Sequence, residues 1–594
     1  MKLCVWVARG AEAFGAFRKA VIEGGMLRPE NLVLGSLFLG LCLGSAGFFV
    51  GRPCSPWTMR LAFGGVLTLT ACCSWRHALR FVATAAVLLL LCAWTFSYTG
   101  TDSVAYHLPM QRLLWHGWNP VFTSTVPAFG ELVDLRSLSP YHTLFLPKAT
   151  AFCGALVAKA TGLFTADAFL GYALILALWR SAWRFAANEW RASAFVCGAF
   201  AAALAFSTKI TSFLAGQVDY TAYAAFVAAA LGFVTWRRTR LPGDLLLTGL
   251  CLGFALLAKS TGLVCGALGC VIVLCLEGRR AEVRWGMVGL GAAVLLAGAS
   301  PLLTAWINYG SPVYPEFSFN PEVPLIDITA DFTGNADALS MGYLSRCVQA
   351  WFSQSLAWKG SAWWQGKETF RPVFEVCAGV GGFGTFFRLL MWGSVVALCL
   401  SRRTATTWLV LFLFFTGHLA PLKYIGYGRY FPQMWAIPFL ALGNLLYAPR
   451  GDWLSPWLPR LRGMAFACTL PLAGLILLRT GAYQARQWRY EWERQARFAQ
   501  MAEISPRWAA ESNHVRYTLH ERLAEAGMTL AEGPEIPWFT VDRELFPVAP
   551  GLPPAPEELK RKMPICDTLR DLFAFPWADL LGHFPHPLWY APTN

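Results

Sequence analysis

The chain has 594 residues, of which 56% are hydrophobic and only 14% are charged, and its mean hydropathy is +0.44. A water-soluble fold cannot bury that much apolar surface, so the composition excludes an ordinary soluble protein and indicates an integral membrane protein. The formal charge of +14 comes largely from arginines clustered between apolar runs. Such a distribution reports membrane orientation, and we expect no nucleic acid partner.

Residues 1–30 form the first predicted element, with Arg9, Arg18, Lys19 and Arg28 at an amphipathic spacing before a full-length apolar run. This pattern predicts a retained segment at the cytoplasmic surface of the membrane and not a cleavable signal peptide. Together with the two apolar runs that follow, it makes up an N-terminal region over residues 1–80.

Apolar runs long enough to cross about 30 Å of hydrocarbon as helices recur up to residue 480. We predict about 13 transmembrane helices, and hence an all-α polytopic membrane protein with its core over residues 81–480. The predicted spans lie near residues 31–50, 58–74, 81–99, 166–185, 193–213, 218–236, 243–259, 260–277, 285–304, 383–400, 406–420, 430–447 and 463–480.

Arginine clusters between these spans all fall on one side of the membrane if the N-terminus is cytoplasmic. The clusters are Arg76 with Arg80, Arg180 with Arg184, Arg237 and Arg238 with Arg240, Arg279 with Arg280, Arg402 with Arg403, and Arg450 with Arg460 and Arg462. Because cytoplasmic loops carry an excess of Lys and Arg, we expect a protein of the cytoplasmic (inner) membrane with its C-terminus outside.

One apolar segment, residues 141–164, is not counted as a crossing. It carries Pro147, Lys148 and Lys159, and a crossing here would place every later arginine cluster outside. We predict a helix that lies at the outer interface or dips into it, where lysine side chains reach water. The outer-face mass then consists of a loop over about 100–165, a Trp-rich loop over 306–382 and a small C-terminal soluble region over 481–594.

Chemistry is expected at the outer face, since the cytoplasmic loops are short. No nucleotide pool exists there, and the sequence has no phosphate-binding GxxxxGK[ST] loop. An enzyme at this face therefore needs a donor that is already activated and is delivered in the membrane. A sugar carried on a polyprenyl phosphate is such a donor. Its transfer requires a carboxylate to accept a proton and cations to stabilise the departing phosphate.

Asp102 lies where the third apolar run ends, in the segment Ser97-Tyr-Thr-Gly-Thr-Asp-Ser-Val-Ala-Tyr-His-Leu-Pro109. An ionisable group at that depth costs free energy unless it has a function or a partner. The alternative interpretation is that Asp102 or Ser103 caps the following helix.

An acidic residue followed by Tyr-His-Leu-Pro resembles the first outer loop of the GT-C class of membrane glycosyltransferases. This class includes the protein O-mannosyltransferases and the bacterial aminoarabinose–lipid A transferases. Three later segments are similar to motifs of the class, in the same order along roughly residues 81–480. They are Ser139-Pro-Tyr-His-Thr-Leu-Phe-Leu-Pro-Lys148, Asn308-Tyr-Gly-Ser-Pro-Val-Tyr-Pro315 and Gly428-Arg-Tyr-Phe-Pro432.

The resemblance implies Asp102 as the general base or acceptor-orienting carboxylate, Lys148 and Arg429 as cations that face the phosphate, and His142 as an assisting group. The alternative for both cations is snorkelling to the outer interface. Many members of the class have two adjacent acidic residues where this chain has Asp102 and Ser103. We therefore expect neither a metal site nor a cofactor.

Two more polar residues are candidates for binding the substrate. Asp219 begins an apolar run in Gly216-Gln-Val-Asp-Tyr220, either as a second carboxylate or as a helix cap. Lys259 lies between two spans in Leu257-Ala-Lys-Ser-Thr-Gly262, where it either neutralises Asp219, binds phosphate or snorkels to the interface.

The sequence therefore predicts a glycosyltransferase that moves a hexosyl or pentosyl group from a polyprenyl-phosphate donor to an outer-face glycan, lipid or protein acceptor. The alternative is a transporter or flippase of lipid-linked envelope precursors. Against it, the sequence shows no duplicated halves, and its ionisable residues gather at span ends. A non-catalytic scaffold is the third interpretation, for which the C-terminal tail carries no assignable motif.

Overall fold

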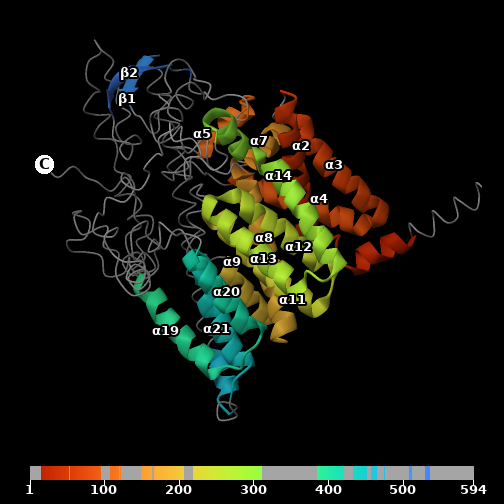
Figure 1. Cartoon of the computed structure of the whole chain (residues 1–594), viewed down its shortest axis with the longest axis vertical. Helices are drawn as coiled ribbons and strands as arrows, with labels where there is room; N and C mark the ends of the chain where they lie inside the picture. Colours follow the sequence, from red (N-terminus) through yellow and green to blue (C-terminus); the bar gives the residue numbers. More distant parts are fainter. Residues whose placement is uncertain are drawn as a thin grey trace, which may run out of the picture.

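The structure is a computed structural model of the chain (Figure 1). It describes residues 15–51, 54–94, 107–121, 149–205, 219–310, 384–419, 432–464, 507–511 and 529–535, with short gaps inside some of these ranges.

The described residues are mostly helical. The helices of the first half are α2 (Pro29–Phe49), α3 (Pro56–Cys73), α4 (Trp75–Trp94), α5 (Leu108–Trp115), α7 (Ala149–Thr161), α8 (Phe169–Glu189), α9 (Ala194–Ala205), α11 (Asp219–Thr239), α12 (Pro242–Ala258), α13 (Ser260–Glu277) and α14 (Ala281–Tyr309). The later elements are α19 (Gly384–Leu400), α20 (Ala405–Leu419), the 3-10 helix η6 (Pro432–Trp435), α21 (Ala436–Tyr447), and the strands β1 (Arg507–Glu511) and β2 (Thr529–Glu535), which pair in parallel.

Three described helices are long and apolar enough to cross a membrane: Pro29–Phe49, Trp75–Trp94 and Ala281–Gly298. Further apolar helices are shorter; they are Ala149–Thr161, Ala194–Ala205, Pro242–Ala258, Thr261–Glu277, Leu390–Leu400 and Ala405–Gly417. These apolar helices identify a helical membrane protein. The count of about 13 spans stays a prediction, and the last predicted span, near 463–480, lies almost wholly outside the described residues.

Local sequence signals set many of the helix boundaries. Pro29, Pro56 and Pro242 stand at the first turn of α2, α3 and α12, where a missing N–H leaves no intrahelical hydrogen bond unmade. Gly310 ends α14 in the left-handed conformation, with φ of 67°, which glycine adopts without a steric penalty.

Helix α11 lies at the centre of the bundle and packs against α8 and α12. It is rich in alanine, and Ala224, Ala225 and Ala228 are fully buried. Small side chains let helix backbones approach closely, which is the usual basis of helix packing in membranes. By contrast, large apolar side chains on α3, α4 and α14 point outward, among them Leu69, Leu90 and Leu295, as expected for helices that face lipid.

The arginine clusters meet at one end of the bundle, which we call the basic end. Arg18 of the N-terminal helix donates a hydrogen bond to the carbonyl oxygen at the end of α3, and Arg28 and Arg184 both pair with Asp244. The same end holds the last turns of α11 and α13, where Arg237 and Arg240 pair with Glu277.

The later helices join the basic end through the turn between α8 and α9. The Trp190 indole in this turn donates a hydrogen bond to Thr406 Oγ1 of α20 at 3.3 Å and stacks on Tyr447 of α21 with ring centroids 5.8 Å apart. Arg402, just before α20, bonds to the Pro449 carbonyl oxygen after α21. The sides predicted from the arginine clusters therefore agree with the packing.

The predicted interfacial helix is α7, and it does not cross the bundle. It packs against α5 (Figure 1), and both return to the end at which α2 finishes, as the Asn119 amide shows by bonding to the Phe48 carbonyl oxygen at 2.7 Å. We call this the opposite end. One expectation needs correction: nine of the thirteen residues of α7 are buried, because α7 packs between α2, α3, α5 and α8.

Candidate functional site

Four of the six predicted site residues, Asp102, His142, Lys148 and Arg429, lie outside the described residues. The other two are placed by helix ends. Asp219 is the first residue of α11, and Lys259 separates α12 from α13. The structure therefore shows the helices that neighbour these residues in sequence, and we call these helices the framework of the predicted site.

This framework falls into two groups at the opposite end. The first group is the α5–α7 pair, in which α5 follows Asp102 and α7 begins immediately after Lys148. The second group is α11, α12, α13 and η6, in which η6 follows Arg429 closely and packs against α11. Helix α7 also contacts α12, so the two groups adjoin.

Cations hold the α5–α7 pair together. The Lys159 amine of α7 donates a hydrogen bond to the Trp115 carbonyl oxygen at the end of α5. The Arg60 guanidinium of α3 donates two hydrogen bonds to the Ala160 carbonyl oxygen of α7, at 3.1 and 2.9 Å. Lys159 therefore has a packing role here, and its side chain does not simply extend to water as predicted.

Two cations, Arg112 and Lys159, lie near His116 in the same corner. Partial burial, together with the charges of these two side chains, lowers the pKa of His116 below its usual value, so its imidazole is mostly neutral at pH 7.

Lys259 lies in a tight turn between two antiparallel helices. Its backbone is extended, and its side chain is partly exposed at the end where α11 begins. Close packing fixes this turn, because a Cβ on Gly262 would come within 2.3 Å of the Ala255 carbonyl oxygen of α12. Lys259 therefore sits on a rigid support at the same end of the bundle as Asp219.

Sequence reasoning missed a buried and fully paired carboxylate, Asp244 in the first turn of α12. It pairs with Arg28 and with Arg184 Nη2 at 2.7 Å, and it accepts a hydrogen bond from Thr239 Oγ1 at 2.8 Å. The carboxylate is only 2% exposed. Its position at the basic end, with every partner from the protein, indicates a structural role that joins α2, α8 and α12.

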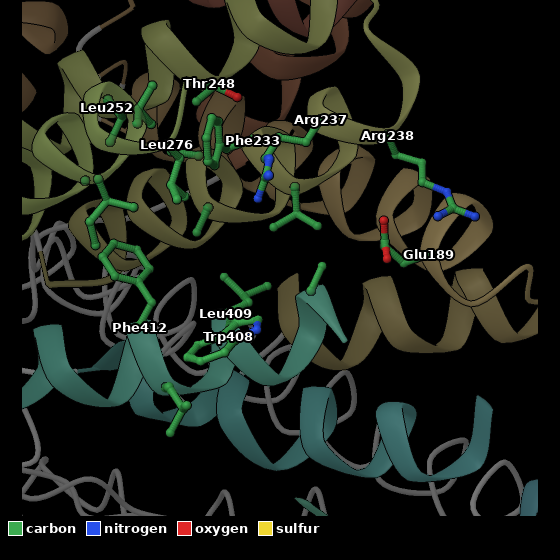
Figure 2. A pocket seen from close by; sticks show the side chains of 18 of the residues that line it. Glu189, Phe233, Arg237, Arg238, Thr248, Leu252, Leu276, Trp408, Leu409 and Phe412 are labelled. Atoms are coloured by element: carbon green, nitrogen blue, oxygen red, sulfur yellow. The ribbon is translucent and has the colours of Figure 1, made fainter. Parts of the chain in front are cut away.

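Sequence reasoning also missed a cavity of about 1110 Å³ near the basic end (Figure 2). It lies between α11, α12 and α13 on one side and α20 on the other, with Glu189 at the end of α8. Figure 2 shows Glu189 and Arg238 close together at one end of the cavity, Leu252 and Phe412 at the other, and Arg237 and Leu276 between them. The Arg237-Arg238 pair is the part of this site that the sequence makes visible. By itself the pair indicates only which end of the helix faces the cytoplasm.

Within the part of the chain that the structure describes, no group of three or more His, Cys, Asp or Glu side chains could hold a metal ion. No family model matches the chain, and no curated protein or solved structure matches it either. The resemblance to GT-C glycosyltransferases therefore rests on the quoted sequence segments alone.

Proposed function

We propose that this protein is a glycosyltransferase of the GT-C type that uses a polyprenyl-phosphate sugar as donor. One observation carries the proposal: the described elements next to the six candidate residues lie at the end of the bundle opposite the arginine clusters. By the positive-inside rule the arginine-rich end is cytoplasmic, which supports a site at the outer face of the inner membrane.

Each candidate residue has a defined part in the transfer. The bond between the sugar C1 and the phosphate oxygen breaks, and polyprenyl phosphate leaves with the electron pair. The acceptor oxygen forms the new bond to C1, and its proton goes to the Asp102 carboxylate as general base. Lys148 and Arg429 stabilise the charge of the departing phosphate, Lys148 as a point charge and Arg429 through bidentate contact.

The other three candidates support the donor and acceptor. His142 assists the two phosphate-binding cations, while Asp219 and Lys259 bind the substrate from the start of α11 and from the α12–α13 turn. The lipid chain of the donor stays in the membrane, and the acceptor, a glycan, lipid or protein, comes from the outer side.

The test is release of polyprenyl phosphate by the purified, reconstituted full chain with a panel of polyprenyl-phosphate sugars. We expect Asp102→Asn to lose at least about 100-fold in rate, the size of a typical general-base contribution, while donor binding is kept. Glu282→Gln serves as the comparison, since it removes an exposed carboxylate at the basic end, outside the proposed site, and should leave the rate unchanged. Full activity of Asp102→Asn would contradict the assigned role.

An assay of donor binding tests the two predicted phosphate-binding cations separately from the general base. We expect Lys148→Ala and Arg429→Ala each to weaken binding of the lipid-linked sugar about tenfold, the loss of one charge-assisted contact. Arg80→Ala, at the basic end, is the matched control and keeps wild-type affinity. Equal weakening in all three variants would mean that the effect reflects overall charge and not a phosphate site.

A transporter or flippase is the second candidate function, and the cavity at the basic end favours it. A flippase requires lipid access on both sides of the membrane, and this cavity offers apolar walls with arginines at one end. Movement of lipid-linked sugar across proteoliposomes, with no covalent transfer, would establish this function in place of the transferase.

A further inference from the structure

We infer that the cavity near the basic end is a binding groove for an anionic glycerophospholipid of the surrounding leaflet. This site is separate from the proposed transfer site, which lies at the opposite end of the bundle. The inference does not depend on the transferase proposal and has its own measurement.

The groove opens sideways toward the hydrocarbon. Its walls include large apolar side chains with much of their surface exposed: Leu276 at 53%, Trp408 at 64% and Phe415 at 60%. The volume of about 1110 Å³ is at the upper end of the range for ligand pockets and is large enough for acyl chains. A lipid can therefore enter from the membrane without crossing the helix bundle.

The charged end has more arginine than carboxylate. Four arginines, Arg237, Arg238, Arg240 and Arg280, surround three carboxylates, and Glu277 alone accepts from three of them at 2.8 to 3.1 Å. The other carboxylates are Glu189, which lines the groove, and Glu282, which pairs with Arg280 at 3.5 Å. Counting all three carboxylates as ionised leaves one positive charge in excess, which is complementary to the single negative charge of a phosphodiester headgroup.

The depth of the groove corresponds to one leaflet. On α20 its lining runs from Ala405 to Phe415, which at the rise of an α-helix is about 15 Å. Half of the hydrocarbon thickness is about 15 Å. A bound lipid therefore places its headgroup among the arginines at the basic end and the ends of its chains near the bilayer centre, beside Phe226 and Phe412.

These three properties favour a phospholipid over a protein helix as the occupant. A partner helix would continue across the whole bilayer and would have no need of charge at one end alone. Basic pockets between membrane helices are known sites for anionic headgroups, and each arginine near the surface strengthens binding about fivefold.

Native mass spectrometry of the full chain in detergent tests the site directly. Phosphatidylglycerol and phosphatidylcholine with identical acyl chains are titrated in parallel, with glycerol phosphate as the headgroup without chains. We expect phosphatidylglycerol to be retained at least about tenfold better than phosphatidylcholine, and glycerol phosphate not to be retained. Equal retention of the two lipids, or binding of glycerol phosphate alone, would overturn the proposal.

Two matched pairs of variants locate the site. For the headgroup, Arg237→Gln with Arg238→Gln is compared with Arg76→Gln and Arg80→Gln, which removes the same charge from the basic end outside the groove. For the chains, Leu276→Trp is compared with Val271→Trp, since both positions are on α13 and are 53% and 55% exposed, but only Leu276 lines the groove.

We expect the first variant of each pair to lose retention and the second to keep it. Because Arg237 also pairs with Glu277, the single variant Arg238→Gln checks the result without breaking that ion pair, and it should reduce the preference for phosphatidylglycerol about fivefold. Equal loss in both members of a pair would place the lipid elsewhere on the basic end and refute the groove.

Discussion

At the scale of single residues, the two best-supported charged groups are buried acids that bind arginines. Asp244 is nearly inaccessible and binds arginines from α2 and α8, and Glu277 is 8% exposed and binds three. A buried charge is tolerated only when it is paired and hydrogen-bonded, and removing one partner leaves the other charges uncompensated. These acids therefore keep the arginine-rich end of the bundle intact.

Asp244→Asn should destabilise the protein strongly. The substitution leaves Arg28 and Arg184 facing a neutral amide in a site with little water, and breaking such a buried pair costs about 3–5 kcal/mol. Unfolding in detergent, followed by the loss of monodisperse protein with temperature, measures the change.

Glu282→Gln is the control for this prediction. Glu282 pairs with Arg280 at 3.5 Å and is 55% exposed, so its removal should cost no more than about 0.5 kcal/mol. If Asp244→Asn and Glu282→Gln unfolded at the same temperature, Asp244 would have no role in joining the helices.

At the scale of elements, small residues decide which helices approach one another. Trp190, in the turn between α8 and α9, fits against Gly443 of α21, where a Cβ would come within 2.1 Å of the indole ring. Similarly, Gly44 of α2 makes room for Phe152 of α7, and Phe152 stacks on Phe48. These contacts explain why α7 is buried although its sequence resembles that of an interfacial helix.

Gly443→Ala should therefore loosen the packing of α21 on the turn between α8 and α9. The added methyl group displaces the Trp190 ring, which also stacks on Tyr447 and bonds to Thr406, and overpacking of this kind costs about 1–3 kcal/mol.

Gly393→Ala in α19 is a matched control for Gly443→Ala. Nothing lies within 4 Å of an added Cβ there, so it should be neutral or stabilising by up to about 1 kcal/mol. Thermal unfolding of both variants checks the difference, and equal destabilisation would show that steric contact at Trp190 is not the cause.

At the scale of the whole molecule, the arrangement of charge predicts the orientation in the membrane. All described arginine clusters gather at one end, and cytoplasmic ends of membrane proteins carry the excess of basic residues. In intact cells, a membrane-impermeant thiol reagent should therefore label Cys566 of the C-terminal region and should not label an Arg403→Cys variant at position 403.

Peptide mapping identifies the labelled sites in this experiment. Cys54, in the turn between α2 and α3, is an internal negative control, because burial raises the pKa of its thiol to about 12 and keeps it protonated at pH 8. Labelling of position 403 before permeabilisation would reverse the orientation and would remove the basis for an outer-face transferase.

The sequence alone determined the class of the protein, a helical membrane protein, and the gathering of the described arginine clusters at one end of the bundle. Both follow from local quantities: the length of an apolar run compared with the bilayer, and the sign of charge in the loop after it. For this reason the excluded crossing at residues 141–164 could be recognised from chain order, and the packing of α5 and α7 agrees with it.

Only the tertiary structure could show the pairing of Asp244 with Arg28, 216 residues away, the burial of α7 and the lipid-sized groove beside Arg237. Each of these three features depends on which helices face each other and on the volumes of the side chains between them. None of the three is encoded in the periodicity of a single segment. The residues predicted for catalysis adjoin the ends of helices that meet at one end of the bundle. Their roles follow from the sequence resemblance, whereas the groove follows from packing.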